Sequence, residues 1–233
     1  MPRRDGRDPS DLRPVTIQRH FLRTCPGSVL YRCGGTSVLV TAQIQDDVPP
    51  FLVGKGTGWL TAEYAMMPGS TPSRKKRGPD GRATEIQRLI GRSLRAAVDL
   101  SALGPITIAV DADVMEADGG TRTAAITAAY VAVADALAAR FGEGSSKFLK
   151  AQVAAVSAGI IGGVPMLDLD YSEDSRADVD LNVVRLGPAG YVEVQGTGEG
   201  GIFGRDELTA MLDLASAGID RLMAAQLEAL VSG

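Results

Sequence analysis

The sequence has little of the chemistry on which many enzymes depend. It contains one histidine, His20, and two cysteines, Cys25 and Cys33, among 233 residues. A Ser-His-Asp triad or a histidine-rich metal site would need that single imidazole, and a lone histidine in the first predicted strand is more often structural. The cysteines lack the CxxC spacing of zinc and redox motifs, so we expect ordinary thiols in a reducing cytoplasm.

Signals for membranes, export and P-loop nucleotide binding are also missing. No uninterrupted apolar run approaches the ~18 residues of a membrane span, and the polar residues 1–13 are unlike a secretory signal. The sequence has no GxxxxGK[ST] motif, which excludes a P-loop site. These absences favour a protein with no membrane partner.

The composition and the order of elements predict one α+β domain spanning residues 1–233. Hydrophobic residues make up 45% of the chain, enough for a substantial core, and neither a repeat nor a linker divides it. Apolar residues at i, i+3, i+4 spacing predict a helix at 82–103, and an amphipathic pattern predicts one at 205–231. A long helix dominated by alanine is expected from 121 to about 141. Strands are expected at 15–21, 28–33, 36–45, 106–114, 153–161, 165–171, 179–186 and 191–195.

Charge is unevenly distributed along this acidic chain. The formal net charge is −4, which argues against nucleic-acid binding, but a local basic patch can still hold a polyanion. Such a patch lies in residues 68–81, which we expect to form a mobile surface loop because Pro, Gly and Ser accompany the basic residues. Its basic residues are Arg74, Lys75, Lys76 and Arg77. A solvated surface run is the alternative.

The strongest local signal lies at residues 118–123. Gly119 and Gly120 end a strand and let the backbone approach a ligand closely. The helix that begins at Thr121 offers unpaired N–H groups and a positive dipole end, which together bind anions. Arg122 opposes that dipole, so a bound anion explains it better. The alternative is an ordinary helix N-cap made by Asp or Thr.

Arg82 and a group of aspartates complete the candidates. Arg82 begins the preceding helix and could grip a phosphate, unless it is only a surface charge. Asp168 and Asp170 would share one strand face, and Asp178 and Asp180 another. Converging strands would gather carboxylates for Mg²⁺ or Mn²⁺ and for proton transfer, although an acidic, soluble turn is also possible. An anion site beside carboxylates points to metal-assisted phosphoryl chemistry.

Several motifs in order resemble the ribonuclease PH family along nearly the whole chain. They are LRPV at 12–15, GSV at 27–29, GWLTAEY at 58–64, EIQRLIGR at 85–92, ADGGTRT at 117–123, ED at 173–174 followed by DLN at 180–182, and VQGTG at 194–198. The resemblance implies a fold like ribosomal protein S5 domain 2 and a homohexamer built from dimers. It also implies that inorganic phosphate attacks the terminal 3′ linkage of RNA, reversibly, and trims transfer RNA precursors with release of nucleoside diphosphates.

The resemblance also assigns roles to individual residues. The phosphate ligands would be Arg82, Gly120, Thr121 and Arg122. The catalytic carboxylates would be Asp174 and Asp180, aided by a divalent metal such as Mg²⁺. The loop before Arg82 would contact RNA of a neighbouring subunit. Here that loop is shorter than in the family, and Gly69 stands where the family has an arginine.

Two other functions have to be considered. A catalytically silent ring subunit would bind RNA as a scaffold, but it would have lost the carboxylates or the phosphate-site arginines. A phosphorylase resembling polynucleotide phosphorylase would carry two such cores in a longer chain. The 233 residues hold only one core and keep both sets of residues, so the ribonuclease PH interpretation is favoured.

Overall fold

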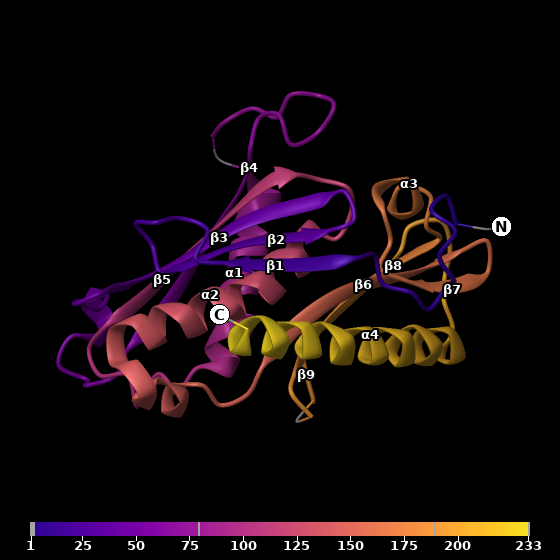
Figure 1. Cartoon of the computed structure of the whole chain (residues 1–233). Helices are drawn as coiled ribbons and strands as arrows, with labels where there is room; N and C mark the ends of the chain where they lie inside the picture. The colour runs from indigo at the N-terminus through magenta and orange to yellow at the C-terminus, as the bar shows by residue number, and fades with distance from the viewer. Residues whose placement is uncertain (1–2, 79, 189, 233) are drawn as a thin grey trace.

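The computed structural model describes residues 3–78, 80–188 and 190–232, which form two β-sheets with helices packed against them (Figure 1). The five-stranded sheet has the order β1-β2-β3-β5-β4 and the four-stranded sheet the order β7-β6-β8-β9. The strands are β1 (Val15–Arg19), β2 (Gly27–Cys33), β3 (Thr36–Gln45), β4 (Trp59–Met66), β5 (Thr107–Glu116), β6 (Val153–Ile161), β7 (Val164–Leu167), β8 (Val179–Leu186) and β9 (Gly190–Gly198). The helices are α1 (Gly81–Ala97), α2 (Thr121–Phe141), α3 (Tyr171–Asp174) and α4 (Arg205–Val231), with short 3₁₀ turns at Pro50–Leu52 and Gly142–Phe148. The predicted α+β class is confirmed.

The first sheet combines a hairpin with a crossover. β2 and β3 pair antiparallel through the predicted glycine turn. β4 pairs parallel with β5, and α1 connects them, as parallel neighbours require. The sequence analysis did not predict β4 as a strand, although Leu60, Ala62 and Tyr64 are buried and alternate with exposed residues. That period-two pattern was the available signal.

Helix α2 forms the centre of the protein, between the two sheets. Its residues from Thr123 to Leu137 are all buried, and many are alanine. Small side chains allow close approach: a Cβ added to Gly27 on β2 would lie 2.7 Å from the Ala132 carbonyl oxygen. By length and composition the segment Thr121–Phe148 could cross a membrane, but 78% of its most apolar stretch is buried in the protein. It is therefore the core helix.

The second sheet is covered by α4. Met211, Ala215, Ile219 and Leu222 of this helix pack on the apolar residues of β6, β7 and β8. The predicted boundaries of α2, α4, β6 and β8 agree with the structure. Long helices and buried strands of this kind carry a strong periodic signal.

Three predicted elements were wrong in part. The helix predicted to reach residue 103 ends at Ala97, because Val98 turns away into a bridge with Leu149. The strand predicted at 165–171 ends at Leu167, because Asp168 has a positive φ of 52° and α3 follows. His20 lies just beyond β1, not in it, and is exposed with its Nδ1 2.9 Å from the Pro26 carbonyl oxygen.

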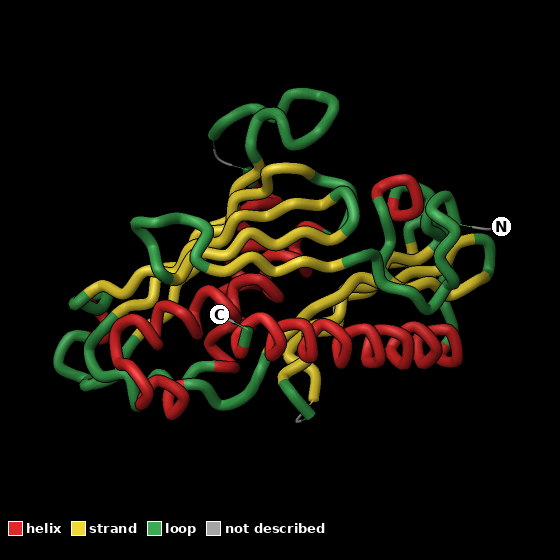
Figure 2. The backbone as a smooth tube through the Cα atoms, in the orientation of Figure 1, coloured by secondary structure: helices red, strands yellow, loops and turns green. Residues whose placement is uncertain are grey.

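The fold brings the ends of several helices and strands to one place. The loop that joins β4 to α1 stands clear of the first sheet, and α3 lies on the same side of the molecule beside the second sheet (Figure 2). The N-terminus of α2 follows β5 directly, through two glycines. Residues distant in sequence therefore meet around the start of α2.

Candidate active site

A pocket of about 190 Å³ lies at the N-terminus of α2. It brings together both arginines, the glycine-threonine turn and two of the aspartates that the sequence analysis singled out. The predicted residues that line it are Arg82, Gly120, Thr121, Arg122, Asp174 and Asp180. These residues come from α1, the β5–α2 turn, α2, α3 and β8. Tertiary structure thus assembles one site from separate motifs.

No side chain of the described residues caps the start of α2. Gly120 occupies the N-cap position in the left-handed conformation, with φ 65° and ψ 22°. Thr123 points its hydroxyl back to the Gly120 carbonyl oxygen at 2.9 Å, and Asp118 accepts instead from the Tyr171 amide at 3.3 Å. The alternative of an ordinary Asp or Thr N-cap is therefore wrong. The first amides of a 21-residue helix remain available to an anion.

Hydrogen bonds fix the glycine turn, and they come from residues that do not line the pocket and that the sequence analysis did not assign to the site. The Arg13 guanidinium donates to the carbonyl oxygens of Asp118 and Gly119, and the Thr36 hydroxyl donates to the Gly119 oxygen at 2.6 Å. A Cβ on Gly119 would lie 2.5 Å from the Leu169 carbonyl oxygen, so only glycine fits there. These contacts fix the backbone that begins α2.

The two arginines of the pocket are held differently. Arg122 Nη1 donates to Gln195 Oε1 at 2.9 Å, and its side chain is only 15% exposed. The Arg82 side chain is exposed and makes no hydrogen bond or ion pair with residues the structure describes. Its backbone amide is bonded to the carboxylate of Asp80, which caps α1. Arg82 is thus free to turn toward a ligand.

The surroundings raise the pKa of both carboxylates of the pocket. Burial raises the pKa of Asp180, and the nearby charge of Asp174 raises it further, while Arg122 and the Asn182 amide act in the opposite direction. Burial also raises the pKa of Asp174, against the charges of Arg82 and Arg122. Asn182 donates to both oxygens of Asp180 at 3.3 and 3.2 Å. Titratable groups whose pKa is shifted by burial and by neighbouring charges are typical of functional sites.

The other aspartates of the predicted cluster have structural roles. Asp168 is buried and ion-paired with Arg13 at 2.7 Å. Asp170 caps α3, and Asp178 accepts from the Gly162 amide at 3.0 Å before β8 begins. The prediction that two strand faces would gather these carboxylates was wrong, because Asp168, Asp170 and Asp178 all lie outside strands.

Three further pocket residues were missed by the sequence analysis. The Tyr64 hydroxyl donates to the Thr121 hydroxyl at 2.8 Å and so ties β4 to α2. The Ser157 hydroxyl is buried without a hydrogen-bond partner among the described residues. Tyr171 is 63% exposed at the edge of the pocket. An unpartnered buried hydroxyl suits a site that receives a hydrogen-bonding ligand.

The donor set fits a divalent cation of the Mg²⁺ type. Asp174 and Asp180 offer hard carboxylate oxygens at one pocket. No group of three or more His, Cys, Asp or Glu side chains able to hold a metal occurs in the part of the chain that the structure describes. Mg²⁺ is commonly bound by one or two carboxylates together with water and substrate phosphates, and these two residues fit such a site.

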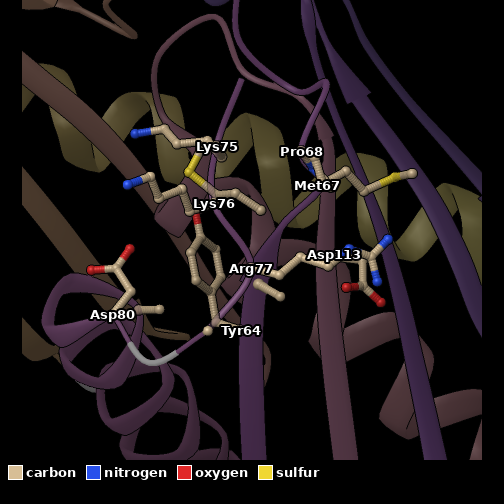
Figure 3. A pocket seen from close by; sticks show the side chains of 12 residues that line it. Tyr64, Met67, Pro68, Lys75, Lys76, Arg77, Asp80 and Asp113 are labelled. Atoms are coloured by element: carbon tan, nitrogen blue, oxygen red, sulfur yellow. The ribbon is translucent and has the colours of Figure 1, made fainter. Parts of the chain in front are cut away.

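The basic loop forms a second pocket of about 340 Å³ that adjoins the first. Lys75, Lys76 and Arg77 line it, and the two lysine side chains extend to the side on which Asp80 lies (Figure 3). Lys75 also lines the pocket at α2, whereas Arg74 is exposed and lines neither. Positive charge thus reaches the candidate site from the loop.

Comparison with known proteins decides the family. Residues 11–138 match domain 1, and residues 151–218 match domain 2, of the 3′ exoribonuclease family. The chain is 52% identical to ribonuclease PH of Synechococcus sp. strain JA-3-3Ab, over 98% of both chains. Ribonuclease PH of Synechococcus sp. strain JA-2-3B'a(2-13) is equally similar, over 98% of this chain and 97% of the relative.

The chain belongs to the 3′ exoribonuclease family. It is a phosphate-dependent 3′ exoribonuclease, as the resemblance in the sequence predicted. Solved structures confirm the fold. Rice Rrp46 superimposes with a TM-score of 0.81 at 19% identity, covering 98% of this chain and 100% of the other. The Archaeoglobus fulgidus exosome with RNA bound to the active site gives 0.82 at 24% identity, over 96% and 92%.

Proposed function

We propose that the pocket at the start of α2 binds the attacking phosphate and holds the 3′ end of RNA for cleavage. The observation that supports this is the uncapped N-terminus of α2, with Arg122 beside it and Arg82 facing it. Unpaired amides and two guanidinium groups are the donors that a phosphate dianion requires. Thr121 adds a hydroxyl, which accepts from Tyr64 and so can donate to an anion.

The reaction is a transfer of one nucleotidyl group. A phosphate oxygen bonds to the phosphorus of the terminal 3′ linkage, and the bond from that phosphorus to the preceding 3′ oxygen breaks. The products are a nucleoside diphosphate and an RNA shortened by one nucleotide, whose 3′ oxygen takes up a proton. Because an ester is exchanged for an anhydride, the reaction is reversible. Positioning and electrostatic stabilisation are the main contributions of the protein.

Asp174 and Asp180 are proposed to hold the divalent metal. When bound, Mg²⁺ would offset the charge that builds up between phosphate and RNA. The two carboxylates would hold this ion, and Asn182 orients the oxygens of Asp180.

The natural substrates proposed are 3′ extensions of transfer RNA precursors, and the active form a homohexamer, a trimer of dimers. This acidic chain carries a basic run, Arg74, Lys75, Lys76 and Arg77, in the loop beside the site, and the last three line the pocket that adjoins it. Joined subunits would present several such loops to one RNA. The two cysteines are free and buried, which supports a reducing cytoplasm.

We propose that residues 1–233 form one ribonuclease PH domain. The larger hydrophobic core includes Val153, Ala155 and Val184 from the second sheet, so the two sheets share it. The competing function, a catalytically silent RNA scaffold, would have lost the carboxylates or the phosphate-site arginines. The carboxylates and both arginines lie together at one pocket, which supports an active enzyme.

Initial rates measured against phosphate concentration test this assignment. With a 3′-extended transfer RNA, Arg82→Ala and Arg122→Ala should raise the phosphate requirement roughly tenfold to somewhat over a hundredfold, because a charge-assisted contact contributes ~1.5–3 kcal/mol. Asp174→Asn and Asp180→Asn should abolish turnover at every phosphate concentration while RNA binding survives. Release of nucleoside monophosphates without phosphate would contradict the proposal.

A further inference from the structure

Hydrogen bonds join three elements beside the phosphate pocket. Arg122 of α2 donates to Oε1 of Gln195 on β9 at 2.9 Å. Nε2 of the same glutamine donates to Oε1 of Glu85 on α1 at 3.1 Å. Glu85 itself lies 4.0 Å from Arg122 Nη1. The amide of Gln195 therefore bridges a guanidinium and a carboxylate that themselves form only a long ion pair.

The group that holds Arg122 is neutral. An amide oxygen orients a guanidinium without cancelling its charge, whereas a carboxylate in the same position would form a short ion pair. Glu85 is 57% exposed, so water screens its charge, while Arg122 is 15% exposed and keeps a stronger field toward the pocket. An arginine that must attract an anion benefits from such a neutral acceptor.

The register of the second sheet puts this amide in place. Gln195 on β9 lies directly opposite Asn182 on β8. The amide of Asn182 donates to the Asp180 carboxylate, and the amide of Gln195 accepts from Arg122. One cross-strand pair of neutral amides thus orients both a carboxylate and a guanidinium of the same site.

We propose that Gln195 is a positioning residue for phosphate: it aims the Arg122 guanidinium and keeps the Glu85 carboxylate from neutralising it. This inference rests on the proposed phosphate site at α2. It extends that site to β9, within the VQGTG motif at residues 194–198. Gln195 does not line the pocket, so it acts through Arg122.

An isosteric change of charge separates this role from a purely structural one. Gln195→Glu keeps the shape and an acceptor for Arg122 but adds a carboxylate. It should raise the KM for phosphate about tenfold, the size of one charge-assisted contact, while kcat at saturating phosphate stays near normal. Gln195→Leu removes the acceptor and should raise the KM as well. A merely structural glutamine would tolerate Glu better than Leu and show no shift in KM.

Glu85→Gln is the matched control, since it removes a charge at the neighbouring position and should not raise the KM. Phosphate-induced stabilisation in a thermal melt gives a readout independent of turnover, and should weaken in Gln195→Glu but not in Glu85→Gln. If Gln195→Glu keeps the wild-type phosphate dependence while Arg122→Ala loses it, the positioning role is wrong. If Arg122→Ala also keeps it, the phosphate site itself is wrong.

Discussion

Arg13 and Asp168, 155 positions apart in the chain, form a buried ion pair directly behind the glycine turn that begins α2. The backbone amide and Nε of Arg13 both donate to one Asp168 oxygen, at 2.7 and 3.0 Å, and Nη2 donates to the other at 2.7 Å. The same guanidinium also reaches the carbonyl oxygens of Asp118 and Gly119. The N-terminal segment therefore supports the site although Arg13 does not line the pocket.

Removing the carboxylate should destabilise the protein strongly. Asp168→Asn leaves the Arg13 charge buried and poorly paired, which typically costs about 3–5 kcal/mol. Urea unfolding monitored by circular dichroism measures the loss. Asp178→Asn is the control, because that side chain is exposed and should change stability by less than about 1 kcal/mol. Equal losses in both variants would show that the ion pair is not responsible.

The same pair predicts a dependence of stability on pH. Burial alone would raise the pKa of Asp168, but the hydrogen bonds and charge of Arg13 hold it below the ordinary 3.8. The unfolded state therefore binds this proton first, so the stabilisation is present above pH 3.8 and is lost as the pH falls below it. Unfolding free energies of Asp168→Asn should fall less steeply over that acid range than those of the wild type. Parallel curves would refute the pKa shift.

The active-site carboxylates predict the acid limb of the activity profile. Burial and the charge of Asp174 raise the pKa of Asp180 above 3.8, and the proposed metal ligands must be ionised. Protons should therefore compete with Mg²⁺ for Asp180, so the Mg²⁺ concentration needed for turnover at saturating phosphate should rise as the pH falls. Asp180→Asn removes a buried like charge, so it should melt at a higher temperature than the wild type while turnover is lost. A lower melting temperature would contradict this electrostatic account.

Neutralising the basic loop should weaken RNA binding and flatten its salt dependence. The variant replaces Arg74, Lys75, Lys76 and Arg77 with glutamine. If all four contact phosphates of single-stranded RNA, the slope of log K against log salt falls by about 3, at ~0.7 for each contact. Phosphate affinity should change little. The matched control removes the same charge at exposed positions outside both pockets: Arg23, Lys55, Lys147 and Lys150. Equal slopes of log K against log salt in the two variants would show that the loop is only a solvated surface segment.

Tyr171 should provide a stacking surface for the RNA 3′ end. Its side chain is 63% exposed at the edge of the pocket, three residues before Asp174. Base stacking on an aromatic ring contributes ~1–3 kcal/mol and tolerates any base, which suits an enzyme that removes successive nucleotides. Tyr171→Ala should raise the KM for RNA about tenfold, whereas Tyr171→Phe keeps the ring and should behave as wild type. A normal KM in the alanine variant would exclude stacking.

The long helices and the buried strands could be predicted from the sequence. Helix Arg205–Val231 repeats apolar residues with the helical period over many turns, and helix Thr121–Phe141 is a long run dominated by alanine, so local pattern and composition suffice. Strand β4 was not predicted, because Ala62, Glu63 and Ala65 lower its strand propensity although buried and exposed residues alternate. The strand predicted at 165–171 was too long, since a distant partner, Arg13, holds Asp168 where the chain turns.

The residue types of the site were determined by the sequence: a glycine turn before a helix, two arginines and a set of aspartates. Local spacing did not distinguish among the aspartates, and only the family resemblance singled out Asp174 and Asp180; the tertiary structure decided where each of them lies. Asp168 is neutralised by Arg13, and Asp170 is used as a helix cap, whereas Asp174 and Asp180 remain at the pocket. Identical side chains differ in function because burial and charge partners come from residues far away in the chain, which local spacing does not encode.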